Sequence, residues 1–291
     1  MVPETDMMQR RVCAACLAEA TARKPGNVHP GGAFDDLTYG DFVRSAHAAS
    51  PLLAEAAVGT VGRSICAAVE ATRSVVTTNT NLGICLLLAP MVAAARRGAL
   101  QEELPRVLAA TTRDDAAWVY RAIRAAVPGG LGKVDDQDVA DEPTETLLEV
   151  MQRAADRDRI AWQYANEFGD IFEVALPCLQ ASAGKTIEVR IIDLHLRLMS
   201  ALPDSLIARK CGDAVAAESA KRARRVLEAG WPDSRDAQVE LQRLDEWLRA
   251  DGHRRNPGTT ADLVAASLFA ATVEGVLDVE SLSIRRRESG R

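Results

Sequence analysis

The sequence predicts an all-α protein that forms a single compact multi-helix domain. Apolar residues recur at intervals of three and four along almost the whole chain, which is the spacing of one helical face. Alternation of apolar and polar residues, which is typical of a strand, is nearly absent. Aromatic residues make up only 4% of the 291 residues, so the core must be built mainly from Ala, Leu, Val and Ile. Ala is the strongest helix former of all residues.

Capping residues and glycines mark the expected helix boundaries in chain order. Three threonines stand three positions before an acidic residue, a variant of the capping box that begins a helix: Thr38 before Asp41, Thr112 before Asp115 and Thr259 before Asp262. Three glycines that follow helical patterns are expected just beyond helix ends: Gly98, Gly184 and Gly230.

Two apolar stripes in the middle of the chain predict two further helices. The first stripe covers residues 161–175, and Pro177 is expected to kink or end that helix. Residues 75–78, Val-Val-Thr-Thr, are compatible with a short strand and with the entry into a loop. The second stripe has steps of four, three and four residues and is formed by Ile187, Ile191, Leu194 and Leu198.

One acidic, glycine-containing stretch at residues 128–143 interrupts the helical pattern. Its composition is compatible with a domain linker and with a mobile loop over a site. Because helices on both sides of it have apolar faces that need partners, we expect residues 1–291 to form one helical domain.

The charge balance and the hydropathy pattern exclude several classes of protein. The formal net charge is −6, whereas nucleic-acid binders present a basic face, so we expect no nucleic-acid partner. Residues 1–23 carry charges throughout and lack the apolar centre of a signal peptide. The longest apolar run, residues 84–95, is too short to cross a bilayer. We therefore expect a cytoplasmic protein with no membrane partner, whose six cysteines stay reduced.

Two cysteines and two histidines need weighing as site residues. Cys13 and Cys16 have the spacing of half a metal site, but they lie in an apolar helix without a second pair, which favours buried structural thiols. His195 adjoins the second stripe and is interpreted as a partly buried, hydrogen-bonded side chain. His29 lies beside the Lys-Pro-Gly turn, and its titration near neutral pH keeps a site role open.

Polar residues gather in four short segments at helix ends, where helical proteins keep their chemistry. Residues 19–36 contain Glu19, a Lys-Pro-Gly-Asn break and an Asp pair. Residues 77–83 offer hydroxyl and amide groups at a helix start, where backbone N–H groups favour a phosphate. Residues 202–212 place an acid before two adjacent cations, and residues 256–262 precede an apolar helix.

Turn and capping chemistry explains each of these segments when it is taken alone. Taken together, the segments supply acids for Mg²⁺ or for base catalysis, cations for phosphate and helix starts rich in donors. A polyphosphate substrate needs this combination of groups.

The same segments resemble, in order, the motifs of the triphosphoribosyl-dephospho-CoA synthase family. Five blocks in one order, spread over most of the chain, are fairly specific to that family. The matching blocks are Glu19 followed by Lys24-Pro25-Gly26, residues 32–37 (Gly-Ala-Phe-Asp-Asp-Leu), residues 79–83 (Asn-Thr-Asn-Leu-Gly), residues 202–205 with Arg209, and residues 256–263 (Asn-Pro-Gly-Thr-Thr-Ala-Asp-Leu).

The resemblance implies an all-helical transferase that uses ATP and dephospho-CoA. Such an enzyme displaces adenine from ATP and joins the triphosphoribosyl group to a hydroxyl of the second nucleotide. The expected partners are therefore ATP and a nucleotide-type or other small-molecule acceptor, and the expected cofactor is Mg²⁺ bound with ATP. The sequence leaves the oligomeric state open, a homo-oligomer included.

The chemistry of this transfer suggests a role for each polar residue. Cleavage of an N-glycosidic bond passes through an oxocarbenium-like state, which a carboxylate stabilises, and a carboxylate can also deprotonate the attacking hydroxyl. As catalytic residues we predict Glu19, Asp36 and Asp204, and as Mg²⁺ ligands Glu19, Asp36 and Asp262. The residues predicted to bind phosphate or substrate are Lys24, Asn79, Thr80, Arg209, Lys210 and Asn256.

Several positions depart from the family pattern. Phe34 stands where the family has His, Asn81 and Leu82 replace a His-Lys pair, and Thr259 replaces a Gly. These changes predict a divergent member whose acceptor differs from dephospho-CoA. One alternative is a role in the biosynthesis of a tetrahydromethanopterin-linked one-carbon cofactor. Two others are a nucleotide-binding protein without activity and a Mg²⁺-dependent nucleotide hydrolase.

Overall fold

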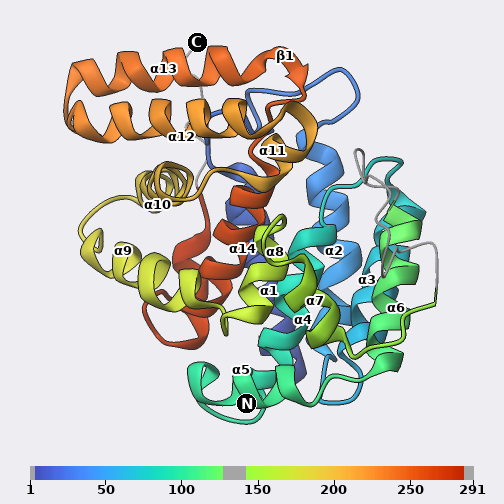
Figure 1. The fold of residues 1–291 in the computed structure, drawn as a ribbon. Coiled ribbons are helices and arrows are strands. Elements are labelled where there is room, and N and C mark those ends of the chain that lie inside the picture. Colours follow the sequence, from blue (N-terminus) through green and yellow to red (C-terminus); the bar gives the residue numbers. More distant parts are fainter. Residues whose placement is uncertain (1–3, 127–141, 285–291) are drawn as a thin grey trace.

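Two helices that are apolar on nearly every side, α4 (Leu82–Ala95) and α14 (Gly258–Val273), pack against each other at the centre of the fold (Figure 1). A helix without a polar face has to be covered all round, and twelve residues in each of these two helices are buried. The computed structural model describes residues 4–126 and 142–284.

The other helices of the described residues surround this pair. Helices α1, α2, α3 and α6 pack one against the next, while α10, α12 and α13 form a second layer with its own apolar cluster. The bounds of the surrounding helices are α1 Glu4–Thr21, α2 Tyr39–Ala54, α3 Val61–Val75, α5 Leu100–Ala109, α6 Arg113–Ala126, α7 Leu147–Ala154, α8 Arg159–Ala165, α9 Leu176–Ala181, α10 Ile187–Ala201, α11 Ser205–Cys211, α12 Asp213–Glu228 and α13 Arg235–Arg249.

The all-α prediction is confirmed. In the described residues β-structure is limited to the short segment β1 (Ala250–His253) and two isolated bridges in residues 29–37. The Val-Val-Thr-Thr stretch ends α3 and enters a loop. The predicted acidic loop at residues 128–143 lies almost entirely outside the described residues.

Two of the three predicted capping boxes are confirmed. Thr38 caps α2 together with Asp41, and the backbone N–H and hydroxyl of Thr112 both donate to Asp115 at the start of α6. The third prediction is wrong, because α14 already begins at Gly258 and Thr259 lies inside it. Asp262 instead contacts the first turn of α4.

The helix predicted over residues 161–175 is interrupted. Helix α8 ends at Ala165, Glu167 and Phe168 adopt left-handed φ values of 52° and 61°, and the chain resumes as a π-helical turn, Asp170–Ala175. Pro177 does not end this run, because it occupies the first turn of α9, where a missing N–H leaves no hydrogen bond unmade. The second stripe forms α10 as predicted.

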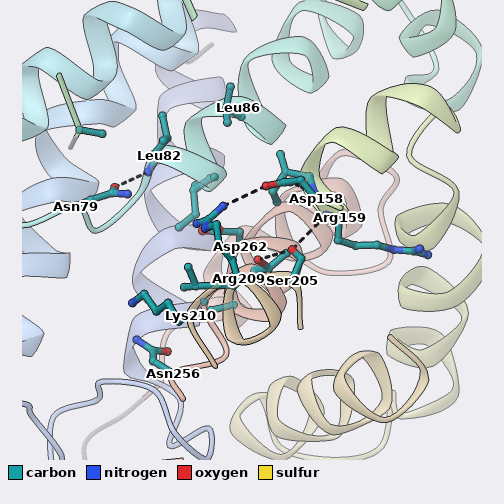
Figure 2. A pocket seen from close by; sticks show the side chains of 18 of the residues that line it. Asn79, Leu82, Leu86, Asp158, Arg159, Ser205, Arg209, Lys210, Asn256 and Asp262 are labelled. Carbon is teal, nitrogen blue, oxygen red and sulfur yellow. Dashed lines mark hydrogen bonds and ion pairs between the residues drawn. The ribbon is translucent and has the colours of Figure 1, made fainter. Parts of the chain in front are cut away.

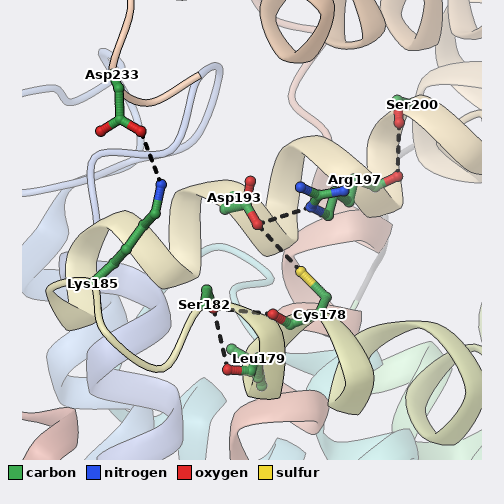
Figure 3. A network of polar contacts seen from close by, with 8 residues as sticks. All are labelled: Cys178, Leu179, Ser182, Lys185, Asp193, Arg197, Ser200 and Asp233. Atoms are coloured by element: carbon green, nitrogen blue, oxygen red, sulfur yellow. Dashed lines mark hydrogen bonds and ion pairs between the residues drawn. The ribbon is translucent and has the colours of Figure 1, made fainter. Parts of the chain in front are cut away.

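Polar contacts hold α9 and α10 together (Figure 3). The Cys178 thiol donates to Asp193 over 3.4 Å, and the Arg197 guanidinium donates to the same carboxylate over 2.9 Å. Burial, and after it the Asp193 carboxylate, raise the pKa of Cys178 to about 12, so this thiol is a poor nucleophile. Lys185 pairs with Asp233 at the exposed end of the same layer.

No single helix within residues 4–126 and 142–284 has the length and apolar character to cross a membrane. Helices α4 and α5 meet the criteria of length and composition only as a pair, and that pair is bent by 113°.

Candidate active site

All four polar segments of the sequence meet at one cavity of about 1650 Å³. It lies where α4, α11 and α14 begin, and the end of α1, the loop before α2 and the α7–α8 connection complete its wall. The first backbone N–H groups of a helix have no partner within that helix. Because three helices begin here, several such N–H groups and the side chains that accept from them lie close together. Of the predicted site residues, Lys24 and Asp204 do not line the cavity. Those that line it are Glu19, Asp36, Asn79, Thr80, Arg209, Lys210, Asn256 and Asp262.

Lys24 is buried and faces Glu19 instead of the cavity. Its ammonium lies 2.9 Å from the Glu19 carboxylate and also donates to the Glu19 backbone carbonyl. The Lys24 side chain is fully buried and the Glu19 side chain is 4% exposed. A buried charge needs a partner, and this pair satisfies both. The Lys-Pro-Gly turn makes the return possible, because Gly26 has a φ of 75° and a Cβ there would lie 2.7 Å from Leu248.

Asp262 projects from the second turn of α14 onto the first turn of α4. Its carboxylate accepts the backbone N–H of Ile84, and a Cβ added to Gly83 would lie only 2.0 Å from one of its oxygens. Gly83 is therefore required for this approach. Burial, and after it the neighbouring carboxylates of Glu19, Asp204 and Asp158, raise the pKa of Asp262 well above its ordinary value.

The polar residues before α4 mostly hold the chain in place. Asn79 accepts the N–H of Leu82, the Thr80 hydroxyl pairs with Ser45, and the Asn81 amide donates to Thr72. Thr80 and Asn81 are buried, whereas Asn79 is exposed at the cavity. Of the three residues, Asn79 is thus the most accessible to a ligand.

Asp204 is a buried carboxylate that joins two helix starts. One of its oxygens accepts the N–H groups of Leu206 and Ile207 at the start of α11. The other accepts the N–H and the hydroxyl of Thr260 in α14, both over 2.8 Å. Burial raises the pKa of Asp204, while these hydrogen bonds act in the opposite direction. With four donors bound, Asp204 positions helices at the edge of the cavity.

Arg209 crosses the cavity towards the α7–α8 connection (Figure 2). Its guanidinium donates to Asp158 over 3.5 Å, and both side chains are about one third exposed, at 29% and 32%. The other oxygen of Asp158 caps α8 by accepting two backbone N–H groups. Arg159 points the opposite way and forms a two-pronged ion pair with Asp170.

Lys210 lies next to Arg209 and has no salt bridge in the described part of the chain. Burial, and after it the Arg209 charge, lower the pKa of Lys210. The Asp36 carboxylate lies 3.0 Å from Nδ1 of His253 at the cavity, within hydrogen-bond distance, and Asp36 is the more exposed of the two. Asn256 accepts the side-chain amide of Asn27, which ties β1 and the start of α14 to the loop after α1.

Neither histidine weighed from the sequence lines the cavity. His195 is fully buried and not partly buried as predicted, and a hydrogen bond with the backbone of Pro25 acts on its ring. Burial and the Lys24 charge lower the pKa of His195 to about 3. His29 accepts the N–H of Gly31, and burial with the Arg249 charge lowers its pKa to about 4.

The predicted metal ligands do not form one cluster. Among the described residues, no group of three or more His, Cys, Asp or Glu side chains is placed to hold a metal ion. Mg²⁺ bound to a nucleotide needs only one or two carboxylates, because phosphates and water supply its other ligands. Glu19 and Asp262 interact with each other at the cavity wall and fit that requirement, while Asp36 is paired with His253.

Several cavity residues were missed by the sequence reading. Arg73 at the end of α3, and Arg157 and Asp158 between α7 and α8, add charges to the wall. The alternating run Asp156-Arg157-Asp158-Arg159 just before a helical stripe was the one available signal. The apolar side of the cavity, formed by α6 and α7, gave no signal, because those residues follow ordinary helical periodicity.

Comparison with known proteins gives a consistent result. Residues 6–280 match the family described as ATP:dephospho-CoA triphosphoribosyl transferase. A crystal structure of a putative triphosphoribosyl-dephospho-coA synthase from Archaeoglobus fulgidus is similar, with 25% identity and a TM-score of 0.62. The alignment covers 79% of this chain and 98% of that one. No curated protein matches. Nothing in these findings supports the three alternatives that the sequence left open.

Proposed function

The chain belongs to the ATP:dephospho-CoA triphosphoribosyl transferase family, and from this premise we propose that it moves the triphosphoribosyl group of ATP to a hydroxyl of dephospho-CoA within the cavity described above. The observation that carries the proposal is that every family-like segment, from Glu19 to Asp262, contributes to this one cavity. Residues 243 positions apart in the sequence meet there.

The size of the cavity supports a two-substrate reaction. Pockets for single small ligands usually enclose about 300–1,000 Å³. The cavity has a volume of about 1650 Å³, so it has room for a donor and an acceptor together. Holding both ligands in one enclosure turns the transfer into a step between neighbours.

The proposed reaction exchanges one bond at the ribose C1′ for another. The bond from C1′ to the adenine nitrogen breaks, and a bond from C1′ to the acceptor oxygen forms. The acceptor hydroxyl loses a proton and the departing adenine gains one, so no oxidant or further reactant is needed. Positive charge develops on the ribose ring between the two events.

Glu19 and Asp262 are placed to assist this exchange. The buried Glu19 is paired with Lys24 and also lines the cavity, where a carboxylate can stabilise the ribose cation or accept the hydroxyl proton. Asp262 lies beside Glu19 at the start of α4. Mg²⁺ arriving with ATP would be held by one or both carboxylates and would neutralise charge on the phosphates.

The triphosphate is assigned to the cations of α11, Arg209 and Lys210. Lys210 has no salt bridge among the described residues, and Arg209 can exchange Asp158 for a phosphate, since their contact of 3.5 Å is long and partly exposed. Asn79 and Asn256 line the same cavity and can donate to phosphate or sugar oxygens. Asp204 keeps α11 and α14 in register beneath these groups.

The test is to incubate the protein with ATP, Mg²⁺ and dephospho-CoA and to separate the products by chromatography. Free adenine together with a joined product is expected. Free adenine with ribose triphosphate would indicate hydrolysis, and the absence of adenine would indicate a binding protein. Either outcome contradicts the proposal.

Because a charge-assisted contact contributes about 1.5–3 kcal/mol, Lys210→Ala should raise the KM for ATP roughly 10-fold to 100-fold. Lys185→Ala, a change at an exposed lysine outside the cavity, should leave the KM unchanged.

A further inference from the structure

One side of the cavity is apolar and lies between α4, α6 and α7. We call it the apolar arm, and it is lined by Leu86, Val119, Ile123, Ala126, Val150 and Met151. Leu86, Val119 and Met151 belong to the main core, so the floor of the arm is rigid packing. Ile123 and Val150 are partly exposed, and their side chains are therefore available to a ligand.

The arm is unsuited to a second charged nucleotide. The charged residue that α7 adds to the cavity wall, Arg153, already forms an ion pair with Glu145. The backbone oxygen of Leu86 accepts the Tyr164 hydroxyl over 2.6 Å. A phosphate placed against Val119 or Ile123 would lose its hydration without a compensating partner.

The arm also offers little to a nucleobase. Tyr120 is the aromatic side chain that α6 adds to the cavity wall, and it is 1% exposed, so its ring face is covered. An accessible aromatic ring lies elsewhere, at Phe42, which lines both the main cavity and a smaller one next to Glu19. Stacking therefore favours a base near Phe42 and leaves the arm for a ligand part without an aromatic ring.

We infer that the apolar arm binds an uncharged, flexible chain attached to the acceptor nucleotide, and so selects acceptors that carry such a chain. The inference rests on the proposed function, because dephospho-CoA is a nucleoside diphosphate that bears a chain of this kind. It goes further, because it places the chain against α6 and α7 and the nucleotide at the charged residues of the cavity, among them Arg209 and Lys210.

The experiment compares dephospho-CoA with ADP by titration calorimetry, since both contain adenosine diphosphate and only dephospho-CoA carries the chain. Wild-type protein is expected to bind dephospho-CoA at least about tenfold more tightly than ADP, since even a methylene-sized apolar contact gives about 10-fold discrimination. Val150→Asn places a polar group in the arm, and it should weaken dephospho-CoA binding about tenfold and leave ADP binding unchanged.

Leu148→Asn is the matched control. Leu148 lies on the same helix, is partly exposed and packs against the core, but it does not line the cavity. This variant should bind both ligands as the wild type does, which separates a local effect in the arm from a general disturbance of α7.

Three results would overturn the inference: equal affinity of the wild type for both ligands, equal weakening of both by Val150→Asn, or the same loss in Leu148→Asn. These binding results are independent of catalysis. If dephospho-CoA binds through the arm but no adenine is released from ATP, the proposed function fails and the assignment of the arm holds.

Discussion

At the scale of single residues, Glu19 forms a buried ion pair with Lys24 at the wall of the cavity. The sequence predicted that Lys24 binds a phosphate. In the structure its ammonium lies 2.9 Å from the Glu19 carboxylate, and its side chain is completely buried. A buried carboxylate needs a partner for its charge, and Lys24 is that partner. Lys24 therefore acts on the proposed chemistry through Glu19.

Removal of the lysine charge should cost far more stability than removal of an exposed one. Lys24→Met leaves Glu19 buried without a partner, and a loss of about 3–5 kcal/mol in the free energy of unfolding is expected. Lys185→Met breaks the exposed pair with Asp233 and should cost no more than about 1 kcal/mol. Urea unfolding of both variants measures the difference, and similar small losses would show that the buried pair contributes little.

His195 makes stability depend on pH in a defined direction. Its folded pKa of about 3 lies below the ordinary 6.5, so the unfolded chain binds the proton first as pH falls. The contribution of neutral His195 is complete above about pH 6.5 and is lost progressively below it, with a slope of up to about 1.4 kcal/mol per pH unit.

The variant His195→Leu should therefore lose less stability than wild type between pH 6.5 and 4. His47→Gln, at an exposed position on α2, provides the comparison and should follow the wild-type curve. The measurement is the free energy of unfolding at several pH values. Parallel curves for wild type and His195→Leu would contradict the assignment.

At the scale of elements, the contact between α4 and α14 brings the two halves of the site together. Asp262 of α14 reaches the first turn of α4 only because Gly83 has no side chain. Each helix is apolar on nearly all sides, so their relative position is set by packing in the core.

Gly83→Ala should displace Asp262 or push the two helices apart. The added Cβ would lie 2.0 Å from the Asp262 carboxylate, and overpacking of this kind costs about 1–3 kcal/mol. Because a displacement of about 1 Å can lower a rate by roughly 100-fold, adenine release should fall by a similar factor. Gly184→Ala is the control, since nothing lies within 4 Å of a Cβ there. Unchanged release by Gly83→Ala would show that the position of Asp262 does not matter.

At the scale of the whole molecule, the cavity is assembled from segments between Glu19 and Asp262, so a ligand in it connects most of the fold. Binding to the folded state alone stabilises that state by mass action, by about 2.7 kcal/mol at a ligand concentration one hundred times Kd. The effect should be visible as a rise in Tm.

With Mg²⁺ and ATP at that concentration, Tm should rise by roughly 5–10 °C. The rise should be smaller without Mg²⁺, and smaller in Lys210→Ala at the same ligand concentration, because both changes remove charge from the triphosphate site. Differential scanning fluorimetry measures these shifts. An equal rise with adenosine alone would indicate that the phosphates contribute nothing.

The sequence by itself determined the class of fold and the segments that form the site. Helical periodicity, threonine caps at α2 and α6, and the glycine after α12 are local signals, because they report on one turn of backbone at a time. The motif order from Glu19 to Asp262 likewise identified segments that line one cavity.

Only the tertiary structure decided what each charged residue does. Lys24 forms an ion pair with Glu19, and Asp204 accepts four hydrogen bonds. The Asp262 carboxylate packs against Gly83, and Arg209 forms an ion pair with Asp158. Each of these pairings except the first joins residues more than fifty positions apart or depends on such a contact, and no local pattern encodes them. The same holds for the apolar arm. Val150 and Leu148 are both apolar residues of one helix, and the sequence does not distinguish them. Only the packing of α7 against α6 places Val150 in the cavity and Leu148 outside it.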